Sequence, residues 1–180
     1  SCKGLGYQQL NIPARCDVER CRKSDTYSVK VYSWTGHTFS KIPDNVLAWF
    51  GTNINISDSR IVHIPFGVPQ QSVDMLSHTN KSSFAIYSNM QSNTVERDAI
   101  KRMFDGLPGV ISEDSVPVSD YVNRLKACPF VLSANGNGSD TYRVLESLYC
   151  GAVPIIVNDE WSKSYDGLPV VKVDNYSNIY

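Results

Sequence analysis

Hydrophobic and polar positions follow two different regimes along this chain, and the regime changes near residue 82. Before that point the pattern is broken. Residues 27–33 (YSVKVYS) alternate apolar and polar side chains as a half-buried strand does, and residues 60–66 (RIVHIPF) predict a second strand. Residues 69–81 are polar and predict a linker. We therefore expect residues 1–80 to form a short N-terminal part that is irregular or β.

After residue 82, short apolar runs alternate with segments of helical spacing. The predicted strands and helices cover residues 83–88, 93–104, 109–111, 118–127, 130–133, 139–150, 153–157 and 169–173. Asn93 or Thr94 is expected to begin the first helix, and Gly151 to end the last. This order predicts an α/β fold over residues 81–180, a Rossmann-like parallel sheet flanked by helices. Ligands of such sheets bind beyond the carboxyl ends of the strands, so we expect a pocket at the end of strand 130–133.

The segment after strand 130–133 carries the pattern with the clearest chemistry. The strand runs into Asn-Gly-Asn-Gly at residues 135–138, and a helix follows directly, with Ser139 or Asp140 as its expected cap. Two glycines one residue apart permit a tight turn and a close approach of the backbone to a ligand. The first N–H groups of a helix are unpaired and lie at the positive end of its dipole, so they attract phosphate.

Two charged residues of this helix extend the phosphate hypothesis. Arg143 lies in the first turn, where a guanidinium adds a permanent positive charge and a two-pronged donor for a diphosphate. Glu146 follows on the same helical face, and its carboxylate can accept two hydrogen bonds from a ribose diol. The alternative is an ordinary glycine turn with a surface ion pair worth about 0.3–0.5 kcal/mol. The segment matches neither a dinucleotide fingerprint nor a Walker A loop, because it lacks a third glycine and a Gly-Lys-Ser/Thr step.

A regular spacing continues from this loop into the strand after the helix. It joins Gly136, Gly138, Asp140, Arg143, Glu146, Leu148, Gly151, Pro154 and Ile155. This run resembles the C-terminal motif of exostosin-like glycosyltransferases, which have the two-Rossmann-domain architecture called GT-B. It is more distantly similar to the α-1,3-fucosyltransferases. Residues 88–97 and 49–67 resemble other segments of the exostosin-like family, the latter its Trp-x-x-x-Asn segment leading to Ile-Pro-x-Gly, so the resemblance covers residues 45–175 in patches.

The resemblance implies a glycosyltransferase that moves a sugar from a nucleotide-diphosphate donor to a glycan or another hydroxyl acceptor. It implies that Arg143 contacts the donor diphosphate and Glu146 the ribose. Neither a cofactor nor a metal is expected, and the sequence has no Asp-x-Asp metal motif. The predicted donor-binding residues are Asn135, Gly136, Asn137, Gly138, Asp140, Arg143, Glu146 and Arg97.

The sequence departs from the family in two places. Ala134 and Asn135 stand where the family usually has Pro-Arg or Pro-x. Residues 1–80 are also short for the family's N-terminal domain, which usually carries the acceptor site and the catalytic base. Activity of this chain alone is therefore an open question, and a nucleotide-sugar-binding module without turnover is the first alternative function.

Four further residues have specific predictions. His37 lies in a predicted loop and is the candidate general base, whereas His63 lies in a predicted strand and is expected to be structural. Arg97 is either a second phosphate contact or a solvated helix residue. Cys16 has Cys21 nearby but no further ligands at zinc-finger spacing, so we expect no metal there.

Composition narrows the function classes. The chain has 180 residues, of which 42% are hydrophobic and 19% charged, which suits one compact domain or one and a half small ones. Its net charge of -1 does not favour a nucleic-acid partner, so a phage-type sugar transferase acting on modified DNA bases is the weaker alternative. No apolar run reaches the roughly 20 residues of a membrane span. Five cysteines, an odd number, indicate no closed disulfide framework and favour a reducing, cytoplasmic location.

Overall fold

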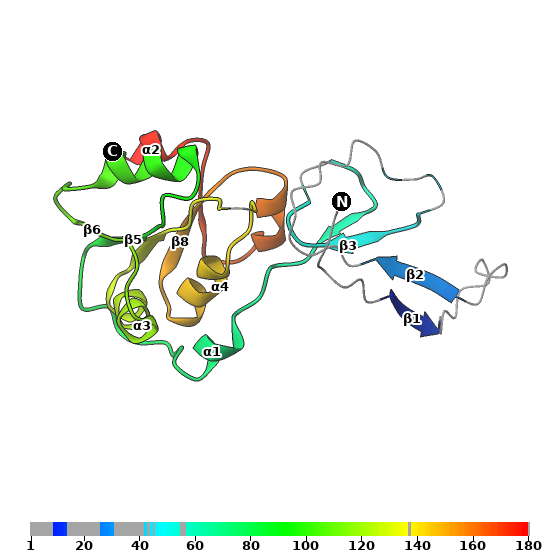
Figure 1. Cartoon of the computed structure of the whole chain (residues 1–180), viewed down its shortest axis with the longest axis horizontal. Helices are drawn as coiled ribbons and strands as arrows, with labels where there is room; N and C mark the ends of the chain where they lie inside the picture. The colour runs from blue at the N-terminus through cyan, green and yellow to red at the C-terminus, as the bar shows by residue number, and fades with distance from the viewer. Residues whose placement is uncertain are drawn as a thin grey trace.

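The computed structural model describes residues 9–13, 26–30, 42, 44, 46–54, 57–136 and 138–179. Before residue 70 it contains two short pairs of strands (Figure 1). β1 (Gln9–Pro13) pairs antiparallel with β2 (Thr26–Lys30), and β3 (Trp49–Gly51) pairs in parallel with β4 (Ile61–His63). β2 and β4 overlap the two strands predicted before residue 82.

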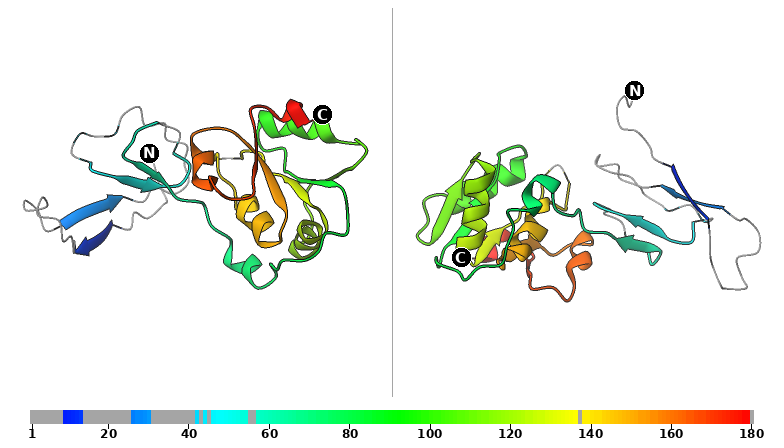
Figure 2. Two further views of the ribbon diagram at one scale, coloured as in Figure 1. Left: turned by 180° about the vertical axis from the view of Figure 1, so that it is seen from behind. Right: turned by 90° about the horizontal axis from the view of Figure 1, so that it is seen from below.

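The chain after residue 82 forms a parallel sheet with helices on both faces, so the predicted fold class is confirmed. The strands are β5 (Ile86–Asn89), β6 (Val110–Glu113), β7 (Phe130–Leu132), β8 (Val153–Val157) and β9 (Val171–Val173). Their order in space is β6-β5-β7-β8-β9, and each neighbouring pair is parallel. Figure 2 shows this Rossmann-like layer from two sides, with β1 and β2 at the far end of the molecule.

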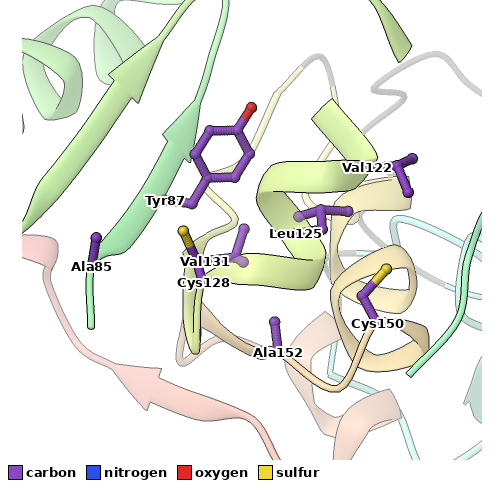
Figure 3. Close-up of a cluster of buried hydrophobic side chains, with 8 residues drawn as sticks. All are labelled: Ala85, Tyr87, Val122, Leu125, Cys128, Val131, Cys150 and Ala152. Atoms are coloured by element: carbon purple, nitrogen blue, oxygen red, sulfur yellow. The ribbon is translucent and has the colours of Figure 1, made fainter. Parts of the chain in front are cut away.

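One face of the sheet is covered by α3 (Val118–Ala127) and α4 (Tyr142–Tyr149). Tyr87 of β5, Val131 of β7 and Leu125 of α3 are fully buried there, in a cluster that also takes in the C-terminal end of α4 (Figure 3). Burial of large apolar side chains of this kind contributes roughly 1.5–3 kcal/mol each. This cluster therefore fixes α3 and α4 side by side against the sheet.

The opposite face is covered by α2 (Val95–Phe104) and by the 3-10 helix η2 (Tyr176–Ile179). Phe104, Leu132 and Tyr176 are buried in a second cluster between these helices and the sheet. Successive side chains of β7 reach the two different clusters, as the period of two along a strand requires. The predicted apolar spacing of residues 93–104 therefore corresponds to the buried face of α2.

The predicted N-cap is confirmed for α2 but is wrong for α4. α2 begins as predicted, with Thr94 as its N-cap and the threonine hydroxyl accepting a hydrogen bond from the Arg97 N–H at 3.1 Å. α4 begins later than predicted, because its N-cap is Thr141 and neither Ser139 nor Asp140. The physical reason is that the Asp140 N–H donates to the side chain of Asn53, and this contact holds the turn outside the helix.

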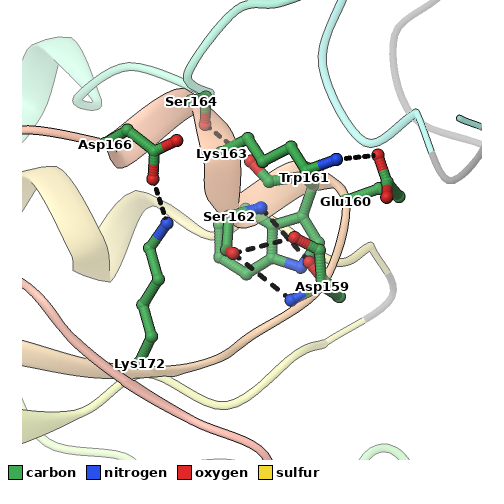
Figure 4. A network of polar contacts seen from close by, with 8 residues as sticks. All are labelled: Asp159, Glu160, Trp161, Ser162, Lys163, Ser164, Asp166 and Lys172. Carbon is green, nitrogen blue, oxygen red and sulfur yellow. Dashed lines mark hydrogen bonds and ion pairs between the residues drawn. The ribbon is translucent and has the colours of Figure 1, made fainter. Parts of the chain in front are cut away.

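A short segment after β8 supports the turn before α4 from the side. The 3-10 helix η1 (Trp161–Tyr165) is closed by reciprocal hydrogen bonds between Asp159 and Ser162, each 3.2 Å from backbone N–H to side-chain oxygen (Figure 4). The Tyr165 hydroxyl donates to a carboxylate oxygen of Asp140 at 2.7 Å.

The predicted linker, residues 69–81, contains one further helical turn, α1 (Gln70–Val73).

The strand order places a crevice at one edge of the sheet. From β5 the chain crosses to β6 on one side, and it then returns to β7 on the other side of β5. The connections that leave the carboxyl ends of β5 and β7 therefore run in opposite directions, towards opposite edges of the sheet. Ligands of open parallel sheets bind at such a switch point.

Candidate functional site

A cavity of about 370 Å³ opens at this switch point, beyond the carboxyl ends of β5 and β6 and beside the start of α4. This volume lies within the range of small-molecule sites. Residues that follow β5 and β6 line it together with residues of α2, α3 and the start of α4. They are Asn89, Gln91, Arg97, Asp114, Ser115, Val116, Val118, Tyr121, Thr141, Tyr142, Arg143 and Glu146.

Glu146 and Tyr121 form a hydrogen-bonded pair in the wall of the cavity. Only 5% of Glu146 is exposed, and its Oε2 accepts a hydrogen bond of 2.7 Å from the Tyr121 hydroxyl. Burial raises the pKa of Tyr121 well above the ordinary value of about 10, so its hydroxyl stays protonated and donates. The carboxylate therefore has a fixed orientation, with its other oxygen free of any hydrogen bond within the described residues.

Arg143 lies over the ring of Tyr121, with its guanidinium carbon 5.9 Å from the ring centroid. Its Nε is buried and has no hydrogen-bond partner within the described part of the chain. The surface ion pair between Arg143 and Glu146, considered as the alternative from the sequence, is absent. Neither residue forms an ion pair within the described ranges.

Thr141 adds a second polar group without a partner. It is the N-cap of α4, but its side chain makes no capping hydrogen bond, and its Oγ1 is buried without a partner among the described residues. The N-terminus of a helix is a favourable place for an anion, because its first N–H groups have no partner within the helix. Thr141 and Arg143 thus present unused donors to the same cavity, where buried polar groups normally find partners.

Arg97 is buried and makes hydrogen bonds within the protein. It is only 8% exposed, and its guanidinium donates to the carbonyl oxygens of Asn135 at 2.7 Å and Ala134 at 3.1 Å. The prediction of a solvated helix residue is therefore wrong. Burial lowers the pKa of Arg97, and the charge of Arg143 lowers it further, but a guanidinium stays protonated in a protein. Arg97 holds the loop after β7 and also lines the cavity.

The two glycines of this loop make room for protein side chains. A Cβ on Gly136 would lie 2.6 Å from a guanidinium nitrogen of Arg97, and a Cβ on Gly138 would lie 2.8 Å from the amide carbon of Asn53. Contacts this short do not occur for real Cβ atoms. At both positions the glycine therefore leaves room for a side chain of the protein itself.

Asp140 is committed to structural contacts. It is 6% exposed, and its carboxylate accepts from the Tyr165 hydroxyl at 2.7 Å and from the Phe66 N–H at 2.6 Å. Burial raises the pKa of Asp140, and these hydrogen bonds oppose the shift. Asp140 does not line the cavity.

The structure therefore brings three of the predicted donor-binding residues into the cavity, and they are Arg97, Arg143 and Glu146. Asn135, Gly136 and Gly138 shape the adjoining loop without lining the cavity. Asn137 and the candidate base His37 lie outside the described residues. His63 lies in β4 and does not line the cavity, and burial lowers its pKa.

Sequence reasoning missed the roles of Thr141 and Tyr121, and of the polar residues after β5 and β6. Tyr121 lies in the predicted helix 118–127, whose apolar spacing assigns no chemistry to it. The signal that could have found the others is the run of polar side chains that follows each strand, such as Asn89 and Gln91 after β5. The carboxyl ends of neighbouring parallel strands meet at one edge, so these side chains converge.

Within the described residues, no group of three or more His, Cys, Asp or Glu side chains could hold a metal ion. Cys16 and Cys21 lie outside those residues. Cys128 and Cys150 are buried free thiols, as their apolar surroundings indicate. No helix in the described ranges has the length and apolar character that a membrane crossing requires.

Comparison with known proteins does not assign the chain to a family. No protein-family model matches the chain, and no curated protein matches it at a significant level. The function is therefore argued from the cavity and its side chains.

Proposed function

We propose that this chain binds a nucleotide-diphosphate sugar in the cavity and transfers the sugar to a hydroxyl acceptor, as a glycosyltransferase of the exostosin-like GT-B type. One observation carries the proposal. Buried donors without partners, on Thr141 and Arg143, lie at a helix N-terminus, and the carboxylate of Glu146 lies one turn further along the same helix. The first group suits a diphosphate and the second a ribose diol.

The diphosphate would lie at the start of α4. There it would accept hydrogen bonds from the Arg143 guanidinium, the Thr141 hydroxyl and the free backbone N–H groups of the first turn. Arg97 adds a second positive charge at the cavity wall, although its donors are mostly used by the loop carbonyls. A ligand with two negative charges would thus meet two guanidinium groups in a partly buried site.

The ribose would lie against Glu146. The Oε2 of this carboxylate accepts from Tyr121, and its Oε1 remains as an acceptor for a sugar hydroxyl. The nucleobase would then extend towards the loop after β6, where Ser115 and Val116 line the cavity. The transferred sugar would extend the other way, towards Tyr142, which is exposed at the cavity and packs edge-on against Phe66 at 4.4 Å.

The chemistry follows from this placement. The bond between the sugar C1 and the diphosphate oxygen breaks, and its electron pair leaves with the diphosphate. The acceptor oxygen forms the new bond to C1 while its proton passes to a base, for which His37 remains our candidate. Arg143 and the start of α4 would stabilise the charge that develops on the leaving diphosphate, so we propose no metal and no cofactor.

Substitution of the two motif residues tests the donor site. Charge-assisted hydrogen bonds are worth roughly 1.5–3 kcal/mol, so Arg143→Ala should weaken binding of a uridine or guanosine diphosphate sugar by at least about tenfold. Glu146→Gln keeps the shape but weakens acceptance from the ribose, so affinity should fall less. Isothermal titration of both variants beside the native chain measures this effect, and a thermal melt checks their folding.

Arg102→Ala is the matched control. Arg102 lies on α2, is exposed, and forms an ion pair of 2.7 Å with Asp98, so its loss should leave donor affinity unchanged. Equal affinity in the native chain and in Arg143→Ala would contradict the donor site. Binding without nucleotide release in the presence of hydroxyl acceptors would identify a binding module without turnover. A salt-dependent shift of DNA in a gel-mobility experiment would instead favour an acceptor in DNA.

A cytoplasmic location remains a prediction from the cysteine content.

A further inference from the structure

Arg143 and Glu146 occupy positions that normally produce an ion pair, yet they do not pair. Opposite charges three residues apart on a helix face one another and attract. In α4, however, the carboxylate of Glu146 turns to α3 and the Nε of Arg143 stays without a partner. The spacing of Arg143 and Glu146 on α4 would permit an ion pair, so a contact from outside the helix must keep the two charges apart.

Tyr121 of α3 contacts both side chains. Its hydroxyl donates to Glu146 at 2.7 Å, and its ring lies under the Arg143 guanidinium at 5.9 Å. A ring face attracts a cation, and a hydroxyl donor fixes a carboxylate, so one side chain holds both charges in separate places. The Tyr121 ring is itself packed against the ring of Tyr87 at 6.1 Å.

We propose that Tyr121 is a positioning residue that prevents Arg143 and Glu146 from neutralising each other. The cavity then keeps a free cation for the anionic part of its ligand and a free carboxylate oxygen for the hydroxyl part. This inference rests on the proposed function for the identity of the ligand. The separation of the two charges is a property of the protein alone and can be measured without a ligand.

Removal of the hydroxyl should join the two charges. In Tyr121→Phe the buried carboxylate of Glu146 loses its donor, and a buried charge without a partner is costly. The unpartnered guanidinium of Arg143, one helical turn away, is the nearest replacement on its own helix. An ion pair between them would occupy the donors that the ligand needs.

Pyrophosphate is the probe for this effect, because it carries the anionic part of the ligand alone. Its affinity, measured by isothermal titration, should fall by about tenfold in Tyr121→Phe, as expected for the loss of one charge-assisted bond. In the double variant Tyr121→Phe/Glu146→Gln the competing carboxylate is gone, so affinity should return to within about threefold of the native value. A role of Tyr121 in packing alone predicts no such recovery.

Tyr87→Phe is the matched control. Tyr87 is a buried tyrosine whose hydroxyl also donates to a glutamate, Glu113 at 3.2 Å, but it does not line the cavity. Its substitution should leave pyrophosphate affinity unchanged. Native affinity in Tyr121→Phe, or a loss that Glu146→Gln does not restore, would overturn the inference.

Crystal structures of the ligand-free native chain and of Tyr121→Phe separate this inference from the proposed function. We expect an ion pair between Arg143 and Glu146 in the variant and none in the native chain. If the native chain binds neither pyrophosphate nor nucleotide diphosphates, the donor site is wrong, and the two structures still decide the role of Tyr121. Absence of the ion pair in the variant would refute that role.

Discussion

Two arginines of the candidate site show how the surroundings of a residue decide what it does. Arg97 is buried and donates to two carbonyl oxygens of the loop after β7, so its guanidinium supports the backbone. Arg143 has a buried Nε without a partner, so its guanidinium remains available. The sequence predicts both residues as donor-binding, but only the tertiary contacts separate a structural arginine from one that can bind a ligand.

The pH dependence of stability provides a test of the burial of Asp140. Burial raises the pKa of its carboxyl in the folded state, whereas the unfolded chain keeps an ordinary value of about 3.9. The folded state therefore holds the proton more tightly. The contribution of Asp140 to stability is then largest below about pH 3.9, and it is lost as the pH rises towards the raised pKa.

Urea unfolding of the native chain and of Asp140→Asn, compared from pH 3.5 upwards, measures this effect. The stability advantage of the native chain over the variant should shrink as the pH rises through that window. Asp105→Asn, at the exposed C-cap of α2, is measured beside it as the control for loss of a surface carboxylate. An advantage that instead grows with pH would mean that Asp140 is stabilised in its ionised form.

At the scale of elements, two of the helices that line the cavity, α2 and α4, have threonine caps in different states. The Thr94 hydroxyl accepts from the first turn of α2, whereas the Thr141 hydroxyl makes no capping bond and remains buried without a partner. Thr94→Ala should therefore lower the free energy of unfolding by about 1 kcal/mol, as loss of an N-cap does. Thr141→Ala should change stability much less but weaken binding of the donor diphosphate.

The two variants serve as controls for each other in urea unfolding and in titration with a nucleotide diphosphate. Thr94 does not line the cavity, so its variant should bind normally once folded. A large stability loss in Thr141→Ala, with native affinity, would assign the Thr141 hydroxyl to capping and remove it from the site.

The elements themselves could be predicted from the sequence, but several of their functional contacts could not. Apolar runs and helical spacing identify all five strands of the parallel sheet, because that pattern reflects burial on a fixed scaffold. The start of α4 was placed too early, because the contact between Asp140 and Asn53 joins residues 87 positions apart. The reasons for Gly136 and Gly138 were missed in the same way, since Arg97 and Asn53 reach them from other elements.

At the scale of the whole molecule, the segment around β3 and β4 is tied to the turn before α4. Asn53 follows β3 in a left-handed conformation with φ of 55°, which asparagine tolerates better than most residues. Its amide oxygen accepts from the Asp140 N–H, and its side chain packs against Gly138. The Phe66 N–H adds a second bond to the same aspartate at 2.6 Å. The residues before the linker thus help to set the position of α4.

This arrangement makes Asn53 a residue that couples the two parts of the chain. Asn53→Ala leaves the Asp140 N–H without its acceptor at a buried position and places alanine in a left-handed conformation. A buried donor without a partner costs about 1–3 kcal/mol, so the free energy of unfolding should fall by roughly that amount. Asn53→Gly loses the same acceptor without the conformational strain, so its free energy of unfolding should fall less. Because the turn leads directly into α4, both variants should also weaken donor binding at the cavity. Asn178→Ala, at an exposed position, is the control and should change neither the free energy of unfolding nor the donor affinity. Urea unfolding and titration with a nucleotide diphosphate measure the two effects, and full stability in Asn53→Ala would mean that this contact does not hold the turn.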